Sequence, residues 1–177
     1  VTSPVLAGVV VEANQVGQSN VIEVSYRMDT GDANRPRGFG LDVKVTPNQD
    51  SNLAAYDFNP DFYVSPGTYS YNSSTQEVNW GRPLVRADNN SFTVEMASLY
   101  ASNDPCHKTP PASSGVLFRF NVSNLSSLIT LSGNTQRAGS DSNGVVREDT
   151  TRTYPQGYVR LIGLDMHPAS TTVPNIV

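Results

Sequence analysis

The sequence predicts an all-β domain, and two features of the chain support that prediction. The first is strict alternation of apolar and polar residues, as in 116–122, which is typical of a strand with one buried face. The residues of that stretch expected on the buried face are Val116, Phe118, Phe120 and Val122. The second is that such stretches are short, recur along the chain and are separated by turn residues, with no convincing helical pattern. Together they predict a two-sheet antiparallel β-sandwich, a jelly roll of about eight or nine strands.

The first half of the chain contains three strands by this pattern. Residues 5–12 form a β-branched run and are expected as the first strand. Residues 21–28 and 38–46 alternate regularly, and Pro47 is expected to end the latter strand. The segments between them are rich in Gly, Asn, Asp and Pro, which favour turns.

The middle of the chain, residues 48–83, is interrupted by prolines and holds seven of the fifteen aromatic residues. Short strands are expected there at 69–71 and 77–80. Alternation then resumes, and the later strands are expected at 92–100, 115–122, 128–132 and 157–166. The remaining polar segments, 101–114 and 133–151, are expected to be loops.

The strand pattern ends at Met166, and this sets the expected domain boundary. Residues 1–166 are predicted to form the sandwich, and residues 167–177, which contain Pro and Thr, a linker or an extended C-terminal arm. A domain of this length buries roughly 70% of its unfolded surface, so its core needs no disulfide.

Composition excludes several classes of protein. The net charge of −4 and the lack of a basic run argue against a nucleic-acid partner. No stretch approaches the ~20 apolar residues of a membrane span. The single cysteine, Cys106, is either free or in an intermolecular disulfide. The low charged fraction of 16% leaves a neutral polar surface, which favours a secreted or cell-surface protein.

The order of these segments resembles the cohesin-like β-sandwich. The resemblance rests on VIEVSYRM, GFGLDVKV, the aromatic middle, GVLFRFNVSNL and LITLSG, and it covers about residues 5–165. The family's Gly-x-Leu-x-x-Phe-x-Val strand is matched by Gly115, Leu117, Phe120 and Val122. The resemblance implies a nine-stranded, secreted protein-binding or scaffold module, with relatives among cellulose-binding domains. It implies no catalytic signature.

Catalysis is not expected from the residues either. Cys106 and His107 are neighbours in a loop, where adjacent side chains usually diverge rather than form a nucleophile and its base. Hydrolysis of a glycoside needs two facing carboxylates. The acidic residues of the strands are explained more simply as side chains on the solvent-exposed face. The candidates considered are Asp61, Glu77, Asp88 and Glu95. We therefore expect no enzyme and no organic cofactor.

Two oxygen-rich segments make Ca²⁺ the one metal to consider. Asp29 and Asp32 lie in the first segment, and Asp141 and Asn143 lie in the second. Calcium takes six to eight oxygen ligands in flexible geometry, and neither segment has EF-hand spacing. A solvated loop is the simpler alternative for both.

The aromatic middle supports two interpretations. Exposed rings could stack on the faces of a polysaccharide, and the residues concerned are Tyr63, Tyr69, Tyr71 and Trp80. Alternatively the rings fill the core, where aromatic side chains dominate burial. We favour core packing and keep carbohydrate binding as the alternative function.

The chain ends suggest assembly with other protein subunits, including copies of the same chain. An apolar terminal strand can complete the sheet of another subunit, and such head-to-tail contacts build filaments. The residues expected to take part are Val5, Leu6, Val9, Val10, Val11, Val173 and Ile176. The alternative is that the first strand pairs within its own sheet. The expected function is thus an extracellular interaction or structural assembly module.

Four Asn-x-Ser/Thr sequons complete the set of candidate sites. They begin at Asn72, Asn89, Asn121 and Asn124. A chain so rich in Asn and Ser produces several such sequons by chance, so they are weak evidence for glycosylation.

Overall fold

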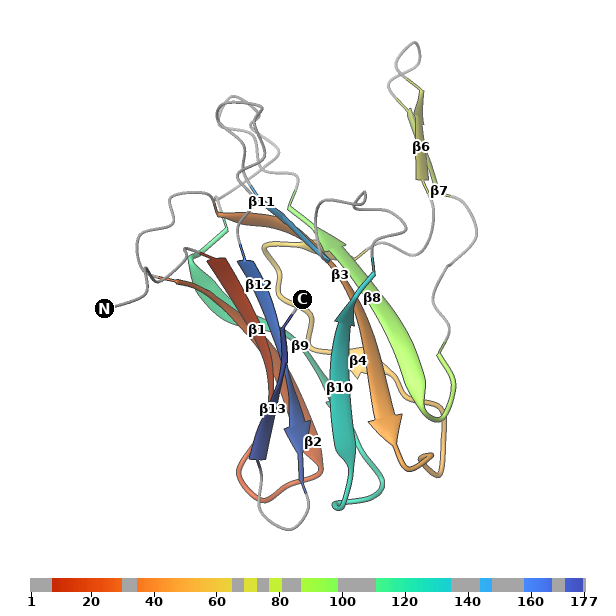
Figure 1. The fold of residues 1–177 in the computed structure, drawn as a ribbon. Helices are drawn as coiled ribbons and strands as arrows, with labels where there is room; N and C mark the ends of the chain where they lie inside the picture. The colour runs from red at the N-terminus through yellow and green to blue at the C-terminus, as the bar shows by residue number, and fades with distance from the viewer. Residues whose placement is uncertain are drawn as a thin grey trace, which may run out of the picture.

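The computed structural model describes residues 8–29, 35–64, 69–72, 77–80, 87–98, 111–134, 144–147, 158–166 and 171–176. These residues form thirteen strands (Figure 1). In chain order the strands are β1 (Gly8–Gln15), β2 (Val21–Met28), β3 (Pro36–Thr46), β4 (Ala55–Tyr56), β5 (Tyr63–Val64), β6 (Tyr69–Asn72), β7 (Glu77–Trp80), β8 (Ser91–Ala97), β9 (Ser114–Asn121), β10 (Leu128–Gly133), β11 (Val145–Arg147), β12 (Tyr158–Asp165) and β13 (Thr171–Ile176).

Nine of the strands pair in the order β4-β9-β2-β1-β12-β10-β3-β8-β5, while β11 adds to β3, β13 adds to β12, and β6 pairs only with β7. The two arms of this path face each other across one core. Phe92 of β8 packs edge to face against Phe118 and Phe120 of β9, with ring centroids 6.0 and 5.1 Å apart. Tyr26 of β2 packs on Phe39 of β3 at 5.1 Å. The expected all-β sandwich is confirmed.

Strand β12 joins the two arms. Along Arg160–Asp165 one of its edges pairs with β13. Because a strand has only two edges, β1 and β10 must share the other, β1 up to Ile162 and β10 from Leu164. Gly163 lies at the change of partner. Before Gly163 the odd-numbered residues Val159 and Leu161 face the core, and after it the even-numbered residues Leu164 and Met166 do.

The pairing of β1 with β12 is parallel, which corrects the prediction of purely antiparallel sheets. All other pairings that the structure describes are antiparallel. A parallel pair needs a long crossover connection, and here nearly the whole domain lies between the two strands. Local sequence patterns cannot reveal such a pairing.

Alternation predicted β2, β3 and β8 well but failed within β9. The register between β2 and β9 shifts after Val24, so that Val24 faces Phe118 and Ser25 faces Val116. Leu117 is the extra residue of this bulge and is fully buried, whereas Val116 is half-buried. The expected burial of Val116 is therefore wrong, because the bulge turns Leu117 into the core instead.

Some strand limits also differ from prediction. Strand β1 continues to Gln15, into the segment expected as a turn. Strand β11 lies in the polar segment expected as a loop, and β13 lies in the expected linker or arm. Residues 171–176, within the segment expected as a linker or an extended C-terminal arm, pair with β12 at six positions.

The connections of the sandwich differ between its two ends. At the lower end in Figure 1 lie the turns 16–20, 47–54, 87–90 and 122–127, together with the last residues of β12. We call this the turn end. At the other end β2, β8 and β10 finish and β3, β9 and β12 begin.

Candidate interaction surfaces

Strand β1 offers no open edge. It pairs with β2 along one edge and with β12 along the other. Val9 and Val11 lie in the core, and Val10 is equally buried on the opposite face. The intrachain pairing that we weighed as the alternative is therefore what the structure contains for these three valines. Val5 and Leu6 lie outside the described residues.

Strand β13 is different, because only one of its edges is paired. All six of its residues pair with β12, and no other described strand pairs with it. Val173 lies in this strand with 38% of its surface exposed, opposite Gly163. The other short strands at sheet margins, β4, β5 and β11, have two or three residues each. Strand β13 is thus the longest open edge in the described part of the chain.

Three of the aromatic residues considered for carbohydrate binding come together in the β6–β7 hairpin, which stands apart from the main sheet in Figure 1. Tyr69 pairs with Trp80, and Tyr71 pairs with Val78. Since directly paired residues and residues two apart share a face of a sheet, these four lie on one face of the hairpin. The other face carries Ser70, Asn72, Glu77 and Asn79. Tyr63 lies in β5, paired with β8, and is not part of this set.

Asp29, the first of the residues proposed for calcium, binds two arginines. Its carboxylate accepts hydrogen bonds from Arg160 Nη2 at 2.8 and 3.0 Å and from Arg27 Nη1 at 3.3 Å. Arg27 and Arg160 are the two cross-strand neighbours of Val10, so this cluster lies over β1. Asp32, Asp141 and Asn143 lie outside the described residues, and the calcium site stays a prediction. Within the described ranges no three acidic, histidine or cysteine side chains gather as a metal site.

The carboxylates considered for hydrolysis are not brought together. Asp88 is exposed in a turn before β8, and Glu95 is near the far end of that strand. Asp88 bonds to Ser91, and the four residues of strand from Ser91 to Glu95 span about 13 Å, beyond the 5–9.5 Å of a glycosidase pair. Asp61 is exposed in the segment before β5, and Glu77 lies in the hairpin. Cys106 and His107 are outside the described residues.

The sequons differ in accessibility. Asn121 and Asn124 are exposed, and Asn89 is half-buried. Asn121 Oδ1 accepts a hydrogen bond from the Tyr56 hydroxyl at 2.7 Å, and Asn124 Oδ1 accepts one from Ser126 N at 2.8 Å. Asn72 lies on the polar face of the hairpin. Glycosylation at these four positions stays a prediction.

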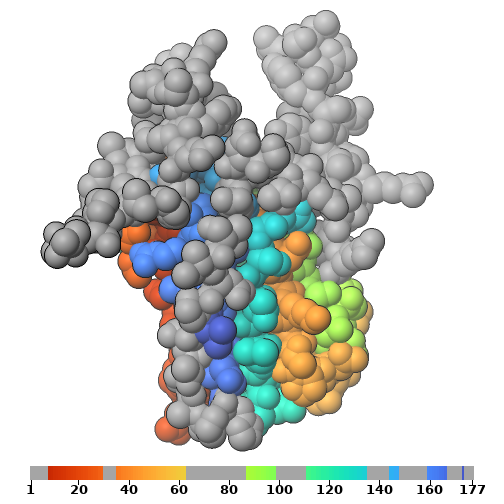
Figure 2. Space-filling model, in the orientation of Figure 1, coloured from red at the N-terminus to blue at the C-terminus, as the bar shows by residue number. Residues whose placement is uncertain are grey.

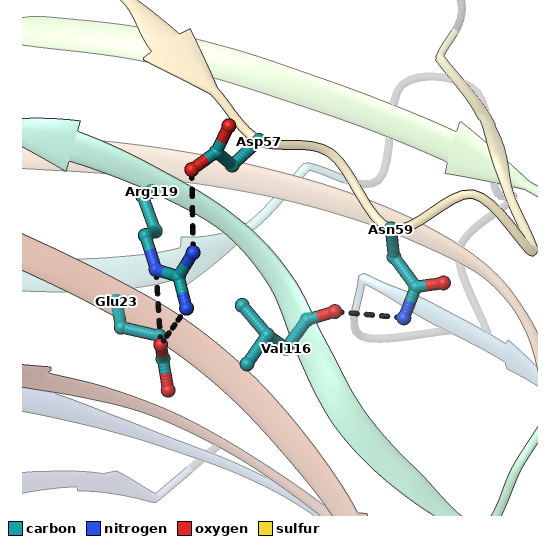
Figure 3. A network of polar contacts seen from close by, with 5 residues as sticks. All are labelled: Glu23, Asp57, Asn59, Val116 and Arg119. Atoms are coloured by element: carbon teal, nitrogen blue, oxygen red, sulfur yellow. Dashed lines mark hydrogen bonds and ion pairs between the residues drawn. The ribbon is translucent and has the colours of Figure 1, made fainter.

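A polar network beside the bulge of β9 fixes the segment that follows β4 (Figure 3). Arg119 donates to Glu23 Oε2 at 2.7 and 3.1 Å and to Asp57 Oδ2 at 3.2 Å. These hydrogen bonds, first to Glu23 and then to Asp57, raise the pKa of Arg119 above its ordinary value. Asn59 Nδ2 donates to the carbonyl oxygen of Val116 at 2.7 Å. The network is built for positioning, since it ties three segments of the chain together.

The outward positions of β10, β3 and β8 are mostly polar, and Leu128 is the exposed apolar residue among them. Figure 2 shows the three strands side by side, in cyan, orange and green. Asp42, at the centre of this face, accepts a hydrogen bond from Thr93 Oγ1 at 2.6 Å. The other residues at outward positions include Lys44, Ser91, Thr130 and Ser132.

The turn end is held together by Gln49, which is 95% buried. Its Oε1 accepts from the Ser123 amide at 2.7 Å, and its Nε2 donates to the carbonyl oxygen of Pro47 at 2.6 Å. Its own amide donates to the carbonyl oxygen of Asn89 at 2.7 Å. One residue thus joins three turns, and sequence analysis missed it because Asn89 and Ser123 lie far along the chain.

Sequence analysis also missed three exposed apolar residues, Val16, Leu125 and Leu128, whereas Val173 was among the residues expected to take part in assembly. Among the described residues, the large hydrophobic side chains with the greatest exposure are Val16, Leu125, Leu128 and Val173, at 43, 53, 39 and 38%. Val16, Leu125 and Leu128 lie in or directly beside the turns of the turn end, and Val173 lies near the start of β13. Solvent exposure depends on the tertiary fold, so no pattern in the sequence marks these positions.

Comparison with known proteins gives matches to solved structures only. No protein-family model matches the sequence, and no curated protein matches it either. Among the described residues no helix is long and apolar enough to cross a membrane.

Two solved structures are similar to this chain, both of the second type II cohesin module from the adaptor ScaA scaffoldin of Acetivibrio cellulolyticus. The structure that includes the long C-terminal linker is 11% identical, covers 97% of this chain and 92% of its own, and has a TM-score of 0.46. The other is 8% identical, covers 96% and 91%, and has a TM-score of 0.40. At these scores the fold assignment rests on the strand pairing and the core described above.

Proposed function

We propose that this domain is a non-catalytic protein–protein interaction or structural assembly module that acts outside the cell, secreted or at a cell surface. The observation that carries the proposal is the open edge of β13. An unpaired strand edge presents N–H and C=O groups to any extended segment. In β13 every residue but Pro174 has an N–H. Addition of a strand at such an edge is a recurring mode of protein recognition.

The apolar residues of the chain ends fit this mode in different ways. Val173 and Ile176 belong to β13 and would form the receiving strand. Val5 and Leu6 precede β1 and would belong to an added strand supplied by another copy. Val9, Val10 and Val11 are part of the receiving domain's own sheet, because both edges of β1 are already paired.

Light scattering over a range of concentrations tests this proposal. We expect the average mass of the intact chain to rise with concentration. Deletion of residues 1–7 removes the proposed added strand and leaves β1 whole, and Val173→Lys places a charge on the receiving strand, which disfavours strand addition. Both changes should leave a monomer. Ala112→Lys is the control, because it places the same charge at an exposed position before β9, away from β13.

Carbohydrate binding is the second candidate, and the register of the β6–β7 hairpin favours it. Tyr69, Tyr71 and Trp80 share one face, and aromatic rings combine a large apolar area with a polar group. A shift of Trp80 fluorescence on adding soluble polysaccharides, lost in Tyr69→Ala and Tyr71→Ala, would support it. An unchanged fluorescence spectrum with every polysaccharide would exclude carbohydrate binding at this hairpin.

A further inference from the structure

The turn end is one continuous surface, because the turns that form it are bonded to one another. Gln49 joins the turns 47–54, 87–90 and 122–127, as described above. The amide of Asp50 donates to Ser123 Oγ at 2.9 Å, which places Asp50 beside the turn that carries Leu125. Met166 N donates to the carbonyl oxygen of Ser127 at 3.0 Å, so the end of β12 joins the same surface.

The β1–β2 turn belongs to this surface as well. Val122 N donates to the carbonyl oxygen of Asn20 at 2.9 Å. Across the turn, Gln15 Nε2 donates a hydrogen bond to the carbonyl oxygen of Ser19 at 2.8 Å. The backbone of the turn end is therefore fixed by hydrogen bonds before any partner arrives. Preorganisation of this kind lowers the entropy lost on binding.

Apolar side chains project from this fixed surface. Leu125 and Leu128 are three residues apart on either side of the buried Ser127, and Val16 lies in the neighbouring turn. Leu128 pairs with Asp165, which also pairs with Thr171 of β13, so the surface continues toward Val173. Single exposed aliphatic residues are ordinary, but a set gathered at one end of a domain marks a contact site.

The charged residues that the structure describes at this surface are all acidic. Asp50 and Asp88 are both exposed, and Asp165 lies at the end of β12. Asp88 Oδ1 accepts hydrogen bonds from the amides of Asn90 and Ser91 within its own turn, so Asp50 is the carboxylate considered for a partner. The nearest described cations along the chain are Lys44 and Arg119, and Arg119 is already bonded to Glu23 and Asp57. Two copies of this chain would bring carboxylates against carboxylates, which is unfavourable.

We infer that the turn end is a docking surface for a partner protein that presents a short apolar segment flanked by lysine or arginine. The leucines and Val16 would bury the apolar segment, and Asp50 would pair with a flanking cation. Complementary charge of this kind speeds encounter and selects the partner. The inference rests on the proposed function, since it names a class of partner for the module, but it uses residues outside the β13 edge.

A pair of synthetic peptides tests the inference. The probe is a 14-residue amphipathic helix built only of Leu and Lys, and its control has Glu in place of every Lys. We expect the Leu–Lys peptide to shift the amide resonances of the turn end in a titration of the isotope-labelled protein, and the Leu–Glu peptide to shift none. Binding should weaken as salt is raised, because the aspartates and lysines are exposed.

Variants locate the contact. Leu125→Ser with Leu128→Ser should weaken binding at least tenfold, and Asp50→Asn about threefold. Asp61→Asn is the matched control, because it removes one exposed carboxylate in the segment before β5 and should change binding little. Resonance shifts centred on another face, equal loss from Asp61→Asn and Asp50→Asn, or unchanged affinity in the leucine variant would each overturn the inference.

The alternative occupant is a second copy of the chain. A dimer that dissociates in Leu125→Ser with Leu128→Ser would show that copies cover this surface, and it would overturn the inference too. Failure of the proposed function is separate, because the assembly assay depends on residues 1–7 and Val173, and the peptide assay on the two leucines.

Discussion

Gly163 of β12 packs so closely against Ile129 of β10 that a Cβ atom at position 163 would overlap the Ile129 carbonyl oxygen. The contact lies where β12 exchanges β1 for β10 as its neighbour. The two arms of the sandwich meet there, and only a residue without a side chain fits. The closure of the sandwich thus depends on this glycine.

We predict that Gly163→Ala destabilises the domain by about 3 kcal/mol, because the obstructing atom is backbone and cannot rotate away. The comparison is Gly17→Ala in the β1–β2 turn, where a Cβ atom would meet nothing within 4 Å and only the positive φ of 60° is unfavourable. That change should cost about 1 kcal/mol. Urea unfolding of both variants measures the difference, and equal losses would contradict the packing argument.

Gln49→Glu should make the turn end sensitive to pH. The Nε2 group that donates to Pro47 would become an oxygen facing the carbonyl, and burial would raise the pKa of the new carboxyl above its ordinary value. We expect a loss of about 3 kcal/mol at pH 7 relative to wild type. Since a raised pKa makes stability fall as pH increases, the loss should shrink toward pH 4. Thermal unfolding at both pH values measures this. A stability loss of the same size at pH 4 and pH 7 would contradict the burial of the Gln49 side chain.

The buried hydroxyl of Tyr26 should make the stability of the domain depend on pH in the alkaline range. Burial, and then the charge of Asp61, raise the pKa of its hydroxyl to about 12. In the unfolded chain the hydroxyl ionises near pH 10, so the contribution of Tyr26 to stability should be constant below pH 10 and fall by roughly 1 to 3 kcal/mol between pH 10 and 12. Ultraviolet titration checks this directly, because wild type minus Tyr26→Phe should isolate one late-ionising tyrosine. A midpoint near 10 in that difference would refute the burial of the hydroxyl.

Tyr26→Phe also removes a long-range contact. The hydroxyl donates to the carbonyl oxygen of Ala112 at 2.8 Å and ties the segment before β9 to β2. The ring contacts with Phe39 and Phe62 remain in the variant. We expect a loss of about 1 kcal/mol at pH 7, together with faster hydrogen exchange at Met28, whose amide donates to Ser113. Unchanged hydrogen exchange at Met28 would show that the hydrogen bond from Tyr26 to Ala112 does not hold this segment against β2.

Asp29→Asn should lower stability in a manner that depends on salt. The carboxylate is 10% exposed and lies between two guanidinium groups that are 43 and 47% exposed. Loss of the charge leaves Arg27 and Arg160 close together, at an expected cost of about 1 kcal/mol in dilute buffer. Half-molar salt should reduce the difference, since exposed charges are screened. A loss that is the same at both salt concentrations would mean that the pairing is not electrostatic.

The sequence predicted the strands whose two faces differ in polarity. In β2 and β3 the inward residues are apolar and most outward ones are polar, so a period of two was visible. Strands β4 and β5 have two residues each, too few to show any period. Strand β11 has only three residues, too few to show a period although Val145 is buried in the core, and β13 is interrupted by Pro174. Their pairing with β3 and β12 is seen only in the structure.

The candidate surfaces were less predictable for a related reason. The apolar ends of the chain suggested assembly, but whether an edge is open depends on which distant strands pair, and β1 proved to be closed on both sides. Gln49 gave no signal, because Ser123, its main partner, is 74 positions away. The register of Tyr69 and Trp80 likewise depends on the turn that joins β6 and β7.

Electron microscopy of the purified chain at increasing concentration tests the central claim most directly. If copies join through the open edge of β13, ordered fibres or sheets should form, and they should be lost on deleting residues 1–7 or in Val173→Lys. Dispersed single domains at every concentration would contradict assembly between copies of this chain.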